Sequence, residues 1–366
     1  MELIRQNTEE RQRTTEHGGN LYEIAEETGI PEDELIDFSA SINPLGVSEK
    51  VRDVIHAGID GLVNYPDPET TLLRRKLAEH YDIGPAAILC GNGSTELIYL
   101  IPRALQPERV LIPSPSFSEY EKAVSSKRKA YSVTAVREIK LNKENKFEIN
   151  PDKYIEQMIG CDMAFLCNPN NPTGTLLGRH EVLRIAEAAR AEKCLLVVDE
   201  AFIDFCPEES VINHVKENPY LIVLRSMTKF YALTGLRIGY GIIHGDLIKT
   251  IRKFKEPWTV NNLAQKAAVA AIDDHSYIQD TVKLMSDEKK YMEKSFRDMG
   301  VEFSPSAANF YLLKMKNAGH LVNELKQKGL VVRDCSNFKG LDSSYVRVAV
   351  KSHTDNERLI EELSKL

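Results

Sequence analysis

The chain has 366 residues, 28% of them charged, and a formal net charge of −7 at pH 7. This length favours two domains, or one large domain with a satellite, over a single compact core. Lysine and arginine are spread along the chain, which argues against a surface for nucleic acid or anionic membrane and favours a small-molecule ligand.

The six cysteines lack the CxxC spacing of metal and redox sites, so we expect reduced, buried thiols and no metal. The N-terminal segment has no apolar stretch typical of a signal peptide. No later segment approaches the roughly 18 uncharged apolar residues of a membrane span. The sequence therefore predicts a soluble, cytoplasmic protein.

From about residue 86 onward, short apolar runs alternate with segments of helical periodicity. This alternation is typical of parallel strands joined by crossover helices, and it predicts an α/β fold. Residues 179–193 should form a helix on the sheet, because Val182, Ile185, Ala186 and Ala189 share one face. The expected strands are residues 86–90, 110–112, 164–167, 195–198, 222–224 and 238–243.

The pattern changes after Trp258. A long polar helix is expected at residues 273–299, followed by strands at 310–313 and 345–350 and a helical C-terminus. The predicted domains are an N-terminal arm that completes part of the small domain, a large domain and a small α+β domain, at residues 1–50, 51–258 and 259–366.

Polar residues follow several predicted strands, where ligands bind in open α/β sheets. The first strand is followed by GNGSTE, which contains Gly93, Ser94 and Thr95. Such a turn at a helix start can hold a phosphate, but the same residues also suit an ordinary turn in which Ser94 or Thr95 is the helix N-cap. The strand at residues 164–167 is followed by NPNNPTG, which is either a rigid turn or a set of amide donors.

Asp199 ends a fully apolar strand, so its carboxylate needs a partner, either a cationic ligand atom or the backbone that an N-cap would bind. Lys229 lies in SMTKFYALTGLRIGYG. A buried lysine loses its proton more readily and can attack an aldehyde, and Ser226, Thr228 and Arg237 beside it can hold a phosphate. A small cofactor with an aldehyde, a phosphate and a basic ring nitrogen is pyridoxal 5'-phosphate.

With these motifs in this order, the chain resembles the fold-type I pyridoxal-phosphate enzymes, in the branch of histidinol-phosphate aminotransferases and threonine-phosphate decarboxylases. The resemblance extends from His17 to the end of the chain. It implies a large domain with a mostly parallel sheet and a smaller α+β domain. The residues that it implies for cofactor binding are Tyr65, Gly93, Ser94, Thr95, Phe117, Asn171, Asp199, Ser226, Thr228, Lys229 and Arg237.

The resemblance also implies individual roles. Lys229 would be the Schiff-base lysine and Asp199 the partner of the pyridine nitrogen, and these two are the implied catalytic residues. Phe117 would stack on the ring, and Asn171 would donate to the ring hydroxyl. Tyr65 would reach the phosphate of a neighbouring subunit, which implies a homodimer with shared sites.

Phe202 departs from the aminotransferases of this branch, which usually have a tyrosine there that hydrogen-bonds to the ring hydroxyl. Three stretches resemble the decarboxylases instead: HGGN, DFSASINPLG and VRDCSNFKGLDSSYVRVAV, at residues 17–20, 37–46 and 332–350. In this resemblance Arg347 binds the substrate carboxylate and Arg333 the substrate phosphate. The implied substrate residues are His17, Asn20, Asn43, Arg333 and Arg347.

The residues alone leave other interpretations open. Either arginine could form a salt bridge or lie in solvent, and His17 could belong to a mobile arm. The resemblance implies decarboxylation of L-threonine O-3-phosphate to (R)-1-amino-2-propanol O-2-phosphate, for the nucleotide loop of cobalamin. The alternatives are decarboxylation of L-serine O-phosphate to ethanolamine phosphate, transamination of histidinol phosphate, and a non-enzymatic protein that senses the cofactor.

Overall fold

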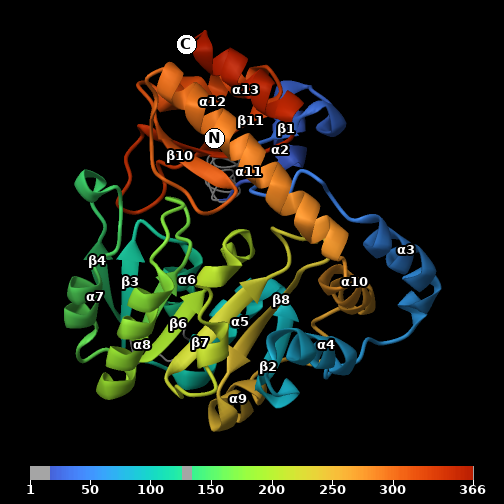
Figure 1. Cartoon of the computed structure of the whole chain (residues 1–366), viewed down its shortest axis with the longest axis vertical. Coiled ribbons are helices and arrows are strands. Elements are labelled where there is room, and N and C mark those ends of the chain that lie inside the picture. Colours follow the sequence, from blue (N-terminus) through green and yellow to red (C-terminus); the bar gives the residue numbers. More distant parts are fainter. Residues whose placement is uncertain (1–16, 126–133, 366) are drawn as a thin grey trace, which may run out of the picture.

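A computed structural model of the chain describes residues 17–125 and 134–365 and shows an α/β molecule in two parts (Figure 1). The larger part is built on a seven-stranded sheet with the order β2-β8-β7-β6-β5-β3-β4. Of the strands described in this sheet, β8 alone runs antiparallel to its neighbours, so the predicted mostly parallel α/β fold is confirmed. The strands are β2 (Ile88–Asn92), β3 (Arg109–Ser114), β4 (Ala135–Lys140), β5 (Met163–Cys167), β6 (Leu195–Asp199), β7 (Leu221–Ser226) and β8 (Ile238–Ile243).

Helices cover both faces of this sheet, because the alternating side chains of its buried strands divide between two apolar clusters. In β7, for example, Leu221 and Val223 enter one cluster and Ile222 and Leu224 enter the other. On the first face lie α3 (Glu49–Gly58), α4 (Thr71–Tyr81), α7 (Pro151–Met158), α8 (Arg179–Glu192) and α10 (Asn262–Ile272). On the second face lie α5 (Gly93–Leu105), α6 (Glu119–Ser125) and α9 (Gly245–Arg252). The α8 residues Val182, Ile185, Ala186 and Ala189 are buried, as their spacing predicts.

The smaller part has a four-stranded antiparallel sheet with the order β12-β13-β10-β9. Its strands are β9 (Glu302–Phe303), β10 (Phe310–Lys314), β12 (Arg333–Asp334) and β13 (Tyr345–Ala349). The N-terminal segment joins this part, because β1 (Ile36–Asp37) pairs in parallel with β11 (Leu330–Val331). The helices of this part are α2 (Leu21–Thr28), α11 (His275–Asp298), α12 (Ala318–Gln327) and α13 (His353–Ser364).

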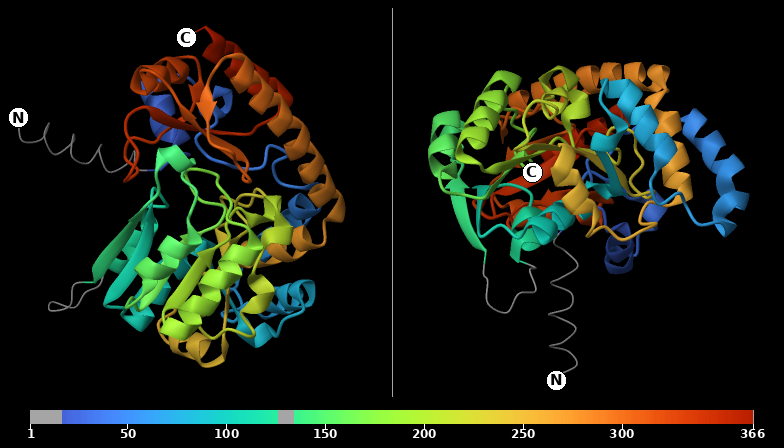
Figure 2. Two further views of the ribbon diagram at one scale, coloured as in Figure 1. Left: turned by 60° about the vertical axis from the view of Figure 1, so that its left-hand side comes forward. Right: turned by 90° about the horizontal axis from the view of Figure 1, so that it is seen from below.

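The smaller part lies over one end of the large sheet, and the long helix α11 runs between the two parts (Figures 1 and 2). The division at residue 258 stays a prediction, and α10, which follows that position, packs in the core of the large part through Ala264, Ala267 and Ala268. Residues 1–16 of the predicted N-terminal arm lie outside the described residues. Among the helices described, none combines the length and apolar character needed to cross a membrane.

Candidate active site

A cavity of about 380 Å³ lies where the carboxyl ends of β5, β6 and β7 face the smaller part. Residues from both parts line it, together with residues 17–18 and 39–41 of the N-terminal segment. The structure brings twelve of the predicted site residues to this cavity: His17, Ser94, Thr95, Phe117, Asn171, Asp199, Ser226, Thr228, Lys229, Arg237, Arg333 and Arg347. The strand-end rule therefore locates one site rather than several separate turns.

Lys229 follows β7, in the loop that leads to β8. Its backbone carbonyl accepts a hydrogen bond from Asn43 N at 3.0 Å, which fixes the loop to the N-terminal segment. Burial lowers the pKa of the Lys229 amine to about 8, and the positive charges of Arg347 and Arg237 act in the same direction. More of this amine than of an ordinary lysine is therefore unprotonated near neutral pH and able to attack a carbonyl carbon.

Asp199 lies at the end of β6 and is only 3% exposed. Its carboxylate accepts hydrogen bonds from Tyr120 Oη at 2.7 Å and from Ala201 N at 3.1 Å. Burial nevertheless raises the pKa of Asp199 to about 6, because these two donors only partly replace water. A cationic atom in the cavity would favour the ionised carboxylate, so this residue fits a protonated ring nitrogen. The contact with Ala201 N also satisfies the backbone turn, but no α-helix begins there.

The start of α5 lies open to the same cavity. The helix N-cap is Asn92, which makes no side-chain capping bond, so the N-cap alternative for Ser94 and Thr95 is wrong. Gly93 has φ of +73°, and a Cβ built on it would lie 2.5 Å from Arg237 Nη2. The guanidinium therefore occupies the space that a side chain at this position would fill.

A second glycine permits the close approach of two segments at this point. A Cβ on Gly239 of β8 would lie 2.3 Å from Ser94 N. On the neighbouring strand end, Ser226 Oγ and Thr228 Oγ1 lie 2.7 Å apart. The backbone N–H groups of a helix start, two hydroxyls and a guanidinium thus converge, which is a donor set suited to a phosphate dianion.

Three side chains lie on the sides of the cavity where a planar ring would fit. Phe117 lines it directly. Asn171 Oδ1 accepts a hydrogen bond from Arg347 Nη1, which leaves the Asn171 amide N–H groups available as donors. Phe202 packs edge-on against Phe310, with ring centroids 5.0 Å apart, and supplies no hydroxyl.

Arg347 of β13 is a buried cation without an anionic partner among the described residues. Its Nη2 donates to the carbonyl oxygen of Ser39 at 2.8 Å and its Nη1 to Asn171 Oδ1, both neutral acceptors. Its Nε has no hydrogen-bond partner. Burial lowers the pKa of Arg347 to about 10. The salt-bridge alternative is therefore wrong for Arg347, and its environment calls for an anion from outside the protein.

Arg333 and His17 line the same cavity from other directions. Arg333 Nη2 donates to Asn337 Oδ1 at 2.8 Å, and its guanidinium lies 5.3 Å from the centre of the Phe338 ring. His17 Nε2 lies 2.9 Å from Glu119 Oε1. Arg333 can present positive charge, and His17 a ring nitrogen, to a ligand near the N-terminal segment.

Four predicted residues do not line the cavity within a single chain: Gly93, which begins α5 beside it, and Asn20, Asn43 and Tyr65. Asn20 caps α2 by accepting from Glu23 N, and it lines a neighbouring cavity of about 350 Å³. Asn43 is buried and donates to the Phe230 carbonyl at 2.8 Å and to Thr281 Oγ1 at 2.7 Å. Tyr65 is 83% exposed, and it packs against Trp258 with ring centroids 5.1 Å apart.

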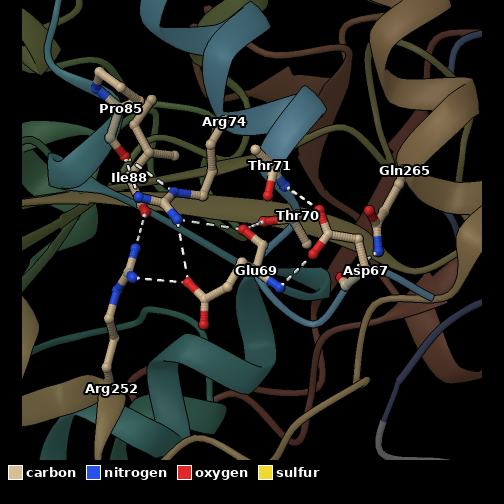
Figure 3. A network of polar contacts seen from close by, with 9 residues as sticks. All are labelled: Asp67, Glu69, Thr70, Thr71, Arg74, Pro85, Ile88, Arg252 and Gln265. Carbon is tan, nitrogen blue, oxygen red and sulfur yellow. Dashed lines mark hydrogen bonds and ion pairs between the residues drawn. The ribbon is translucent and has the colours of Figure 1, made fainter. Parts of the chain in front are cut away.

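The segment after Tyr65 is anchored by a polar network (Figure 3). Asp67 accepts from Glu69 N at 2.9 Å and from Thr71 N at 2.7 Å, so it closes the turn into α4. Arg74 and Arg252 both contact the Glu69 carboxylate, at 3.3 Å and 3.0 Å. Gln265 of α10 donates to the Asp67 carbonyl at 3.0 Å, so helices α4, α9 and α10 together fix the position of the segment.

Sequence reasoning missed two acidic or phenolic residues of the site, Glu119 and Tyr120. Tyr120 donates to Asp199, and Glu119 accepts from Tyr99 Oη at 2.5 Å and Lys122 Nζ at 2.9 Å. The hydrogen bond from His17 is the main reason that the pKa of Glu119 falls to about 2. Their signal was their position in SFSEY, two and three residues after Phe117, at the start of a helix.

All six cysteines are free thiols and buried. Within the described ranges, no group of three or more His, Cys, Asp or Glu side chains could hold a metal ion.

The family model described as aminotransferase class I and II matches residues 33–363. A threonine-phosphate decarboxylase of Salmonella typhimurium is 37% identical, over 95% of this chain and 95% of its own. A bifunctional adenosylcobalamin biosynthesis protein of Leptospira interrogans is 36% identical over 96% of this chain and 41% of its own length. The crystal structure of the histidinol-phosphate aminotransferase from Clostridium acetobutylicum is similar with a TM-score of 0.84 and 30% identity, covering 90% of this chain and 98% of that one.

Proposed function

This chain belongs to the aminotransferase class I and II family, and we propose that it is a pyridoxal-phosphate-dependent decarboxylase of L-threonine O-3-phosphate. The products are (R)-1-amino-2-propanol O-2-phosphate and carbon dioxide. The observation that carries the proposal is the single cavity that holds the Lys229 amine, the Asp199 carboxylate and two arginines, Arg333 and Arg347, from the smaller part. A substrate with one amine, one carboxylate and one phosphate matches this set of charges.

The cofactor would supply an aldehyde for the substrate amine and a cationic ring that accepts electrons from Cα. Asp199 would hold the ring nitrogen in its protonated form, because a nearby cation offsets the cost of a buried carboxylate. Phe117 would stack on the ring, and the amide of Asn171 would donate to its hydroxyl. The phosphate would be held by the α5 start and the strand-end donors, namely Gly93, Ser94, Thr95, Ser226, Thr228 and Arg237.

Lys229 would perform the proton transfer. Its amine, with a pKa lowered to about 8, can exist in both protonation states under working conditions. We assign to it the delivery of a proton to Cα after carbon dioxide has left. Asn43 supports this step indirectly, because its contacts to Lys229 and Phe230 hold the lysine loop in position.

The two substrate anions would bind at different arginines. Arg347, a buried cation whose contacts are neutral oxygens, would take the carboxylate with its planar fork. Arg333 and His17 would take the phosphate, and Asn20 would close this side from the adjoining cavity.

Phe202 is the observation that favours decarboxylation over transamination. Its ring packs on Phe310 and offers no donor to the cofactor oxygen, in contrast to the tyrosine expected in aminotransferases of this branch. Transamination of histidinol phosphate remains the second candidate, supported by the similarity to the Clostridium acetobutylicum aminotransferase. Decarboxylation of L-serine O-phosphate differs from the main proposal by one methyl group, which a pocket distinguishes by about 1–3 kcal/mol.

A homodimer with shared sites completes the proposal. Large apolar side chains are exposed at positions close in the chain to Asp67, Thr71 and Arg252: Ile59, Leu62, Val63, Tyr65, Leu72, Phe254 and Trp258. Exposed apolar side chains that pack on one another, as Tyr65 and Trp258 do, are typical of an interface. Tyr65 of the partner subunit would then reach the phosphate beside Arg237, which is exposed within one chain. The buried thiols suit the reducing cytoplasm, where we place the reaction.

The test is product analysis by mass spectrometry after the cofactor-loaded protein is mixed with L-threonine O-3-phosphate and no keto acid. We expect aminopropanol phosphate and carbon dioxide, and neither from a Lys229→Met variant. L-serine O-phosphate at equal concentration measures the substrate preference. Unchanged substrate, combined with consumption of 2-oxoglutarate in the presence of histidinol phosphate, would refute the decarboxylase and establish the aminotransferase. A role in cobalamin synthesis, supported by the Leptospira interrogans relative, predicts that loss of the gene creates a requirement for aminopropanol phosphate.

A further inference from the structure

Ser41 has a buried hydroxyl that finds no partner in the described protein. Its side chain is 1% exposed and its Oγ makes no hydrogen bond, yet the residue lines the active-site cavity. A hydroxyl that is buried and unpaired costs about 1–3 kcal/mol, so such groups are rare unless a ligand supplies the partner. The orphaned hydroxyl of Ser41 therefore points to a ligand atom with which it pairs.

The backbone on either side of Ser41 fixes where that ligand atom lies. Ser41 is the middle residue of a tight turn, in which Ile42 N donates to the Ala40 carbonyl at 2.9 Å. Two residues earlier, the Ser39 carbonyl accepts from Arg347 Nη2 at 2.8 Å. Two residues later, Asn43 N donates to the Lys229 carbonyl at 3.0 Å. The turn at Ser41 is thus fixed on one side to Lys229 and on the other to Arg347, whose guanidinium contacts only neutral oxygens.

The hydroxyl of Ser39, unlike that of Ser41, already has hydrogen-bond partners. Both serines line the cavity, but the Ser39 hydroxyl is engaged within the protein. It donates to Asp37 Oδ1 at 2.6 Å and accepts from Gly19 N at 2.8 Å. The Ser41 hydroxyl retains its donor for a ligand, whereas that of Ser39 does not.

Arg347 also has a buried donor without a hydrogen-bond partner. This donor is Nε, and the described residues offer the guanidinium no carboxylate. One wall of the cavity therefore carries a guanidinium whose Nε has no acceptor and a hydroxyl donor that has none among the described residues, and this is a site for an anion. Because Lys229 marks the position of the reacting carbon, the anion bound between Lys229 and Arg347 is the one attached to that carbon.

We propose that Ser41 donates a hydrogen bond to the α-carboxylate of the substrate, beside Arg347, and thereby contributes to substrate recognition. This inference rests on the proposed function, since it takes the ligand to be an α-amino acid. A neutral donor suits a group that must leave as uncharged carbon dioxide, because it stabilises the departing carboxylate less than a second cation would.

The experiment compares Ser41→Ala with Ser114→Ala, a matched control. Ser114 is 4% exposed, and its hydroxyl donates to the Lys339 carbonyl at 2.7 Å, away from the cavity. For each cofactor-loaded protein we would measure KM and kcat with L-threonine O-3-phosphate, the competitive inhibition constant of 1-amino-2-propanol O-2-phosphate, and Tm. The second compound carries the amine and the phosphate but no carboxylate.

For Ser41→Ala we expect KM for the carboxylate-bearing compound to rise about tenfold or more, with inhibition by the carboxylate-free amine unchanged. Its Tm should stay constant or rise, because the variant removes an unpaired hydroxyl. Ser114→Ala should show the reverse: a lower Tm and an unchanged KM. Ser41→Thr keeps the hydroxyl and should recover most of the substrate binding.

Equal weakening of both compounds would overturn the proposal, because Ser41 would then contact the cofactor or the substrate phosphate. Unchanged KM would also overturn it, and so would a fall in Tm that accompanies the rise in KM. If the wild-type protein releases no carbon dioxide, the proposed function fails by itself. The same two compounds can then be titrated against the absorbance of the bound cofactor, and their affinity ratio in Ser41→Ala still decides the role of Ser41.

Discussion

The glycine that begins α5 offers a direct test of the proposed phosphate site. Gly93 has φ of +73°, a conformation that costs a residue with a Cβ about 1–2 kcal/mol. A Cβ at this position would in addition lie 2.5 Å from Arg237 Nη2, which is closer than non-bonded atoms approach. Gly93→Ala must therefore displace either the guanidinium or the start of the helix.

The expected loss of cofactor affinity follows from the hydrogen bond between Arg237 and the cofactor phosphate. A hydrogen bond between charged groups contributes about 1.5–3 kcal/mol, so moving Arg237 off the cofactor phosphate should weaken cofactor binding about 10- to 150-fold. We would measure the dissociation constant of pyridoxal phosphate by absorbance titration and the stability of the cofactor-free protein by urea denaturation.

Gly29 is the matched control. It ends α2 with φ of +71°, but nothing lies within 4 Å of a Cβ built on it. Gly29→Ala and Gly93→Ala thus carry the same backbone cost, while only Gly93→Ala meets Arg237. Equal cofactor affinity in the two variants would refute the assignment of Arg237 and the α5 start as the phosphate site.

Three further predictions concern Asp199, the buried ion pair of Arg225 with Glu200, and Tyr65. Burial raises the pKa of Asp199 to about 6, above its ordinary value, so the cofactor-free protein should lose stability as pH rises from about 4 to about 6. Asp199→Asn should flatten this pH dependence in urea denaturation. An unaltered profile would mean that Asp199 does not have the raised pKa. Arg225→Met should lower the free energy of unfolding by about 3–5 kcal/mol, because the carboxylate of Glu200, 1% exposed, would lose the guanidinium that lies 3.2 Å away. A loss below about 1 kcal/mol would show that this ion pair contributes little to stability. Tyr65→Phe should weaken cofactor binding about tenfold while Tyr22→Phe, also exposed, does not, and equal affinities would argue against a shared site.

The fold was predictable where strands are buried on both faces. Strands such as β6 read as continuous apolar runs, because each side chain enters one of the two cores. The edge strand β4 was missed, since its residues AVREIK are mostly exposed or half-buried and, among the strands that the structure describes, it pairs with β3 alone. The antiparallel direction of β8 has no local signal, because it depends on how the chain returns across the sheet.

The candidate site was predictable to the extent that single segments carry it. Ser226, Thr228 and Lys229 follow one strand and could be read together. Contacts between distant segments could not be predicted from the sequence. The Tyr120 hydroxyl, for example, donates to Asp199 only because α6 packs on the sheet. Asn43 was predicted as a substrate residue from its motif alone. In the structure its side chain donates to Phe230 and Thr281 and does not line the cavity.

The charges around Lys229 suggest why these groups lie together. In the protein alone, burial lowers the pKa of the Lys229 amine and the positive charges of Arg347 and Arg237 add to the effect, which keeps the amine reactive toward an aldehyde. In the proposed reaction, the cofactor phosphate would offset the positive charge of Arg237 and the substrate carboxylate that of Arg347. The Lys229 amine should therefore hold a proton more firmly once cofactor and substrate are both bound. Loss of carbon dioxide removes the anion at Arg347 alone. The pKa of Lys229 should then fall again, at the step at which the lysine would give its proton to carbon.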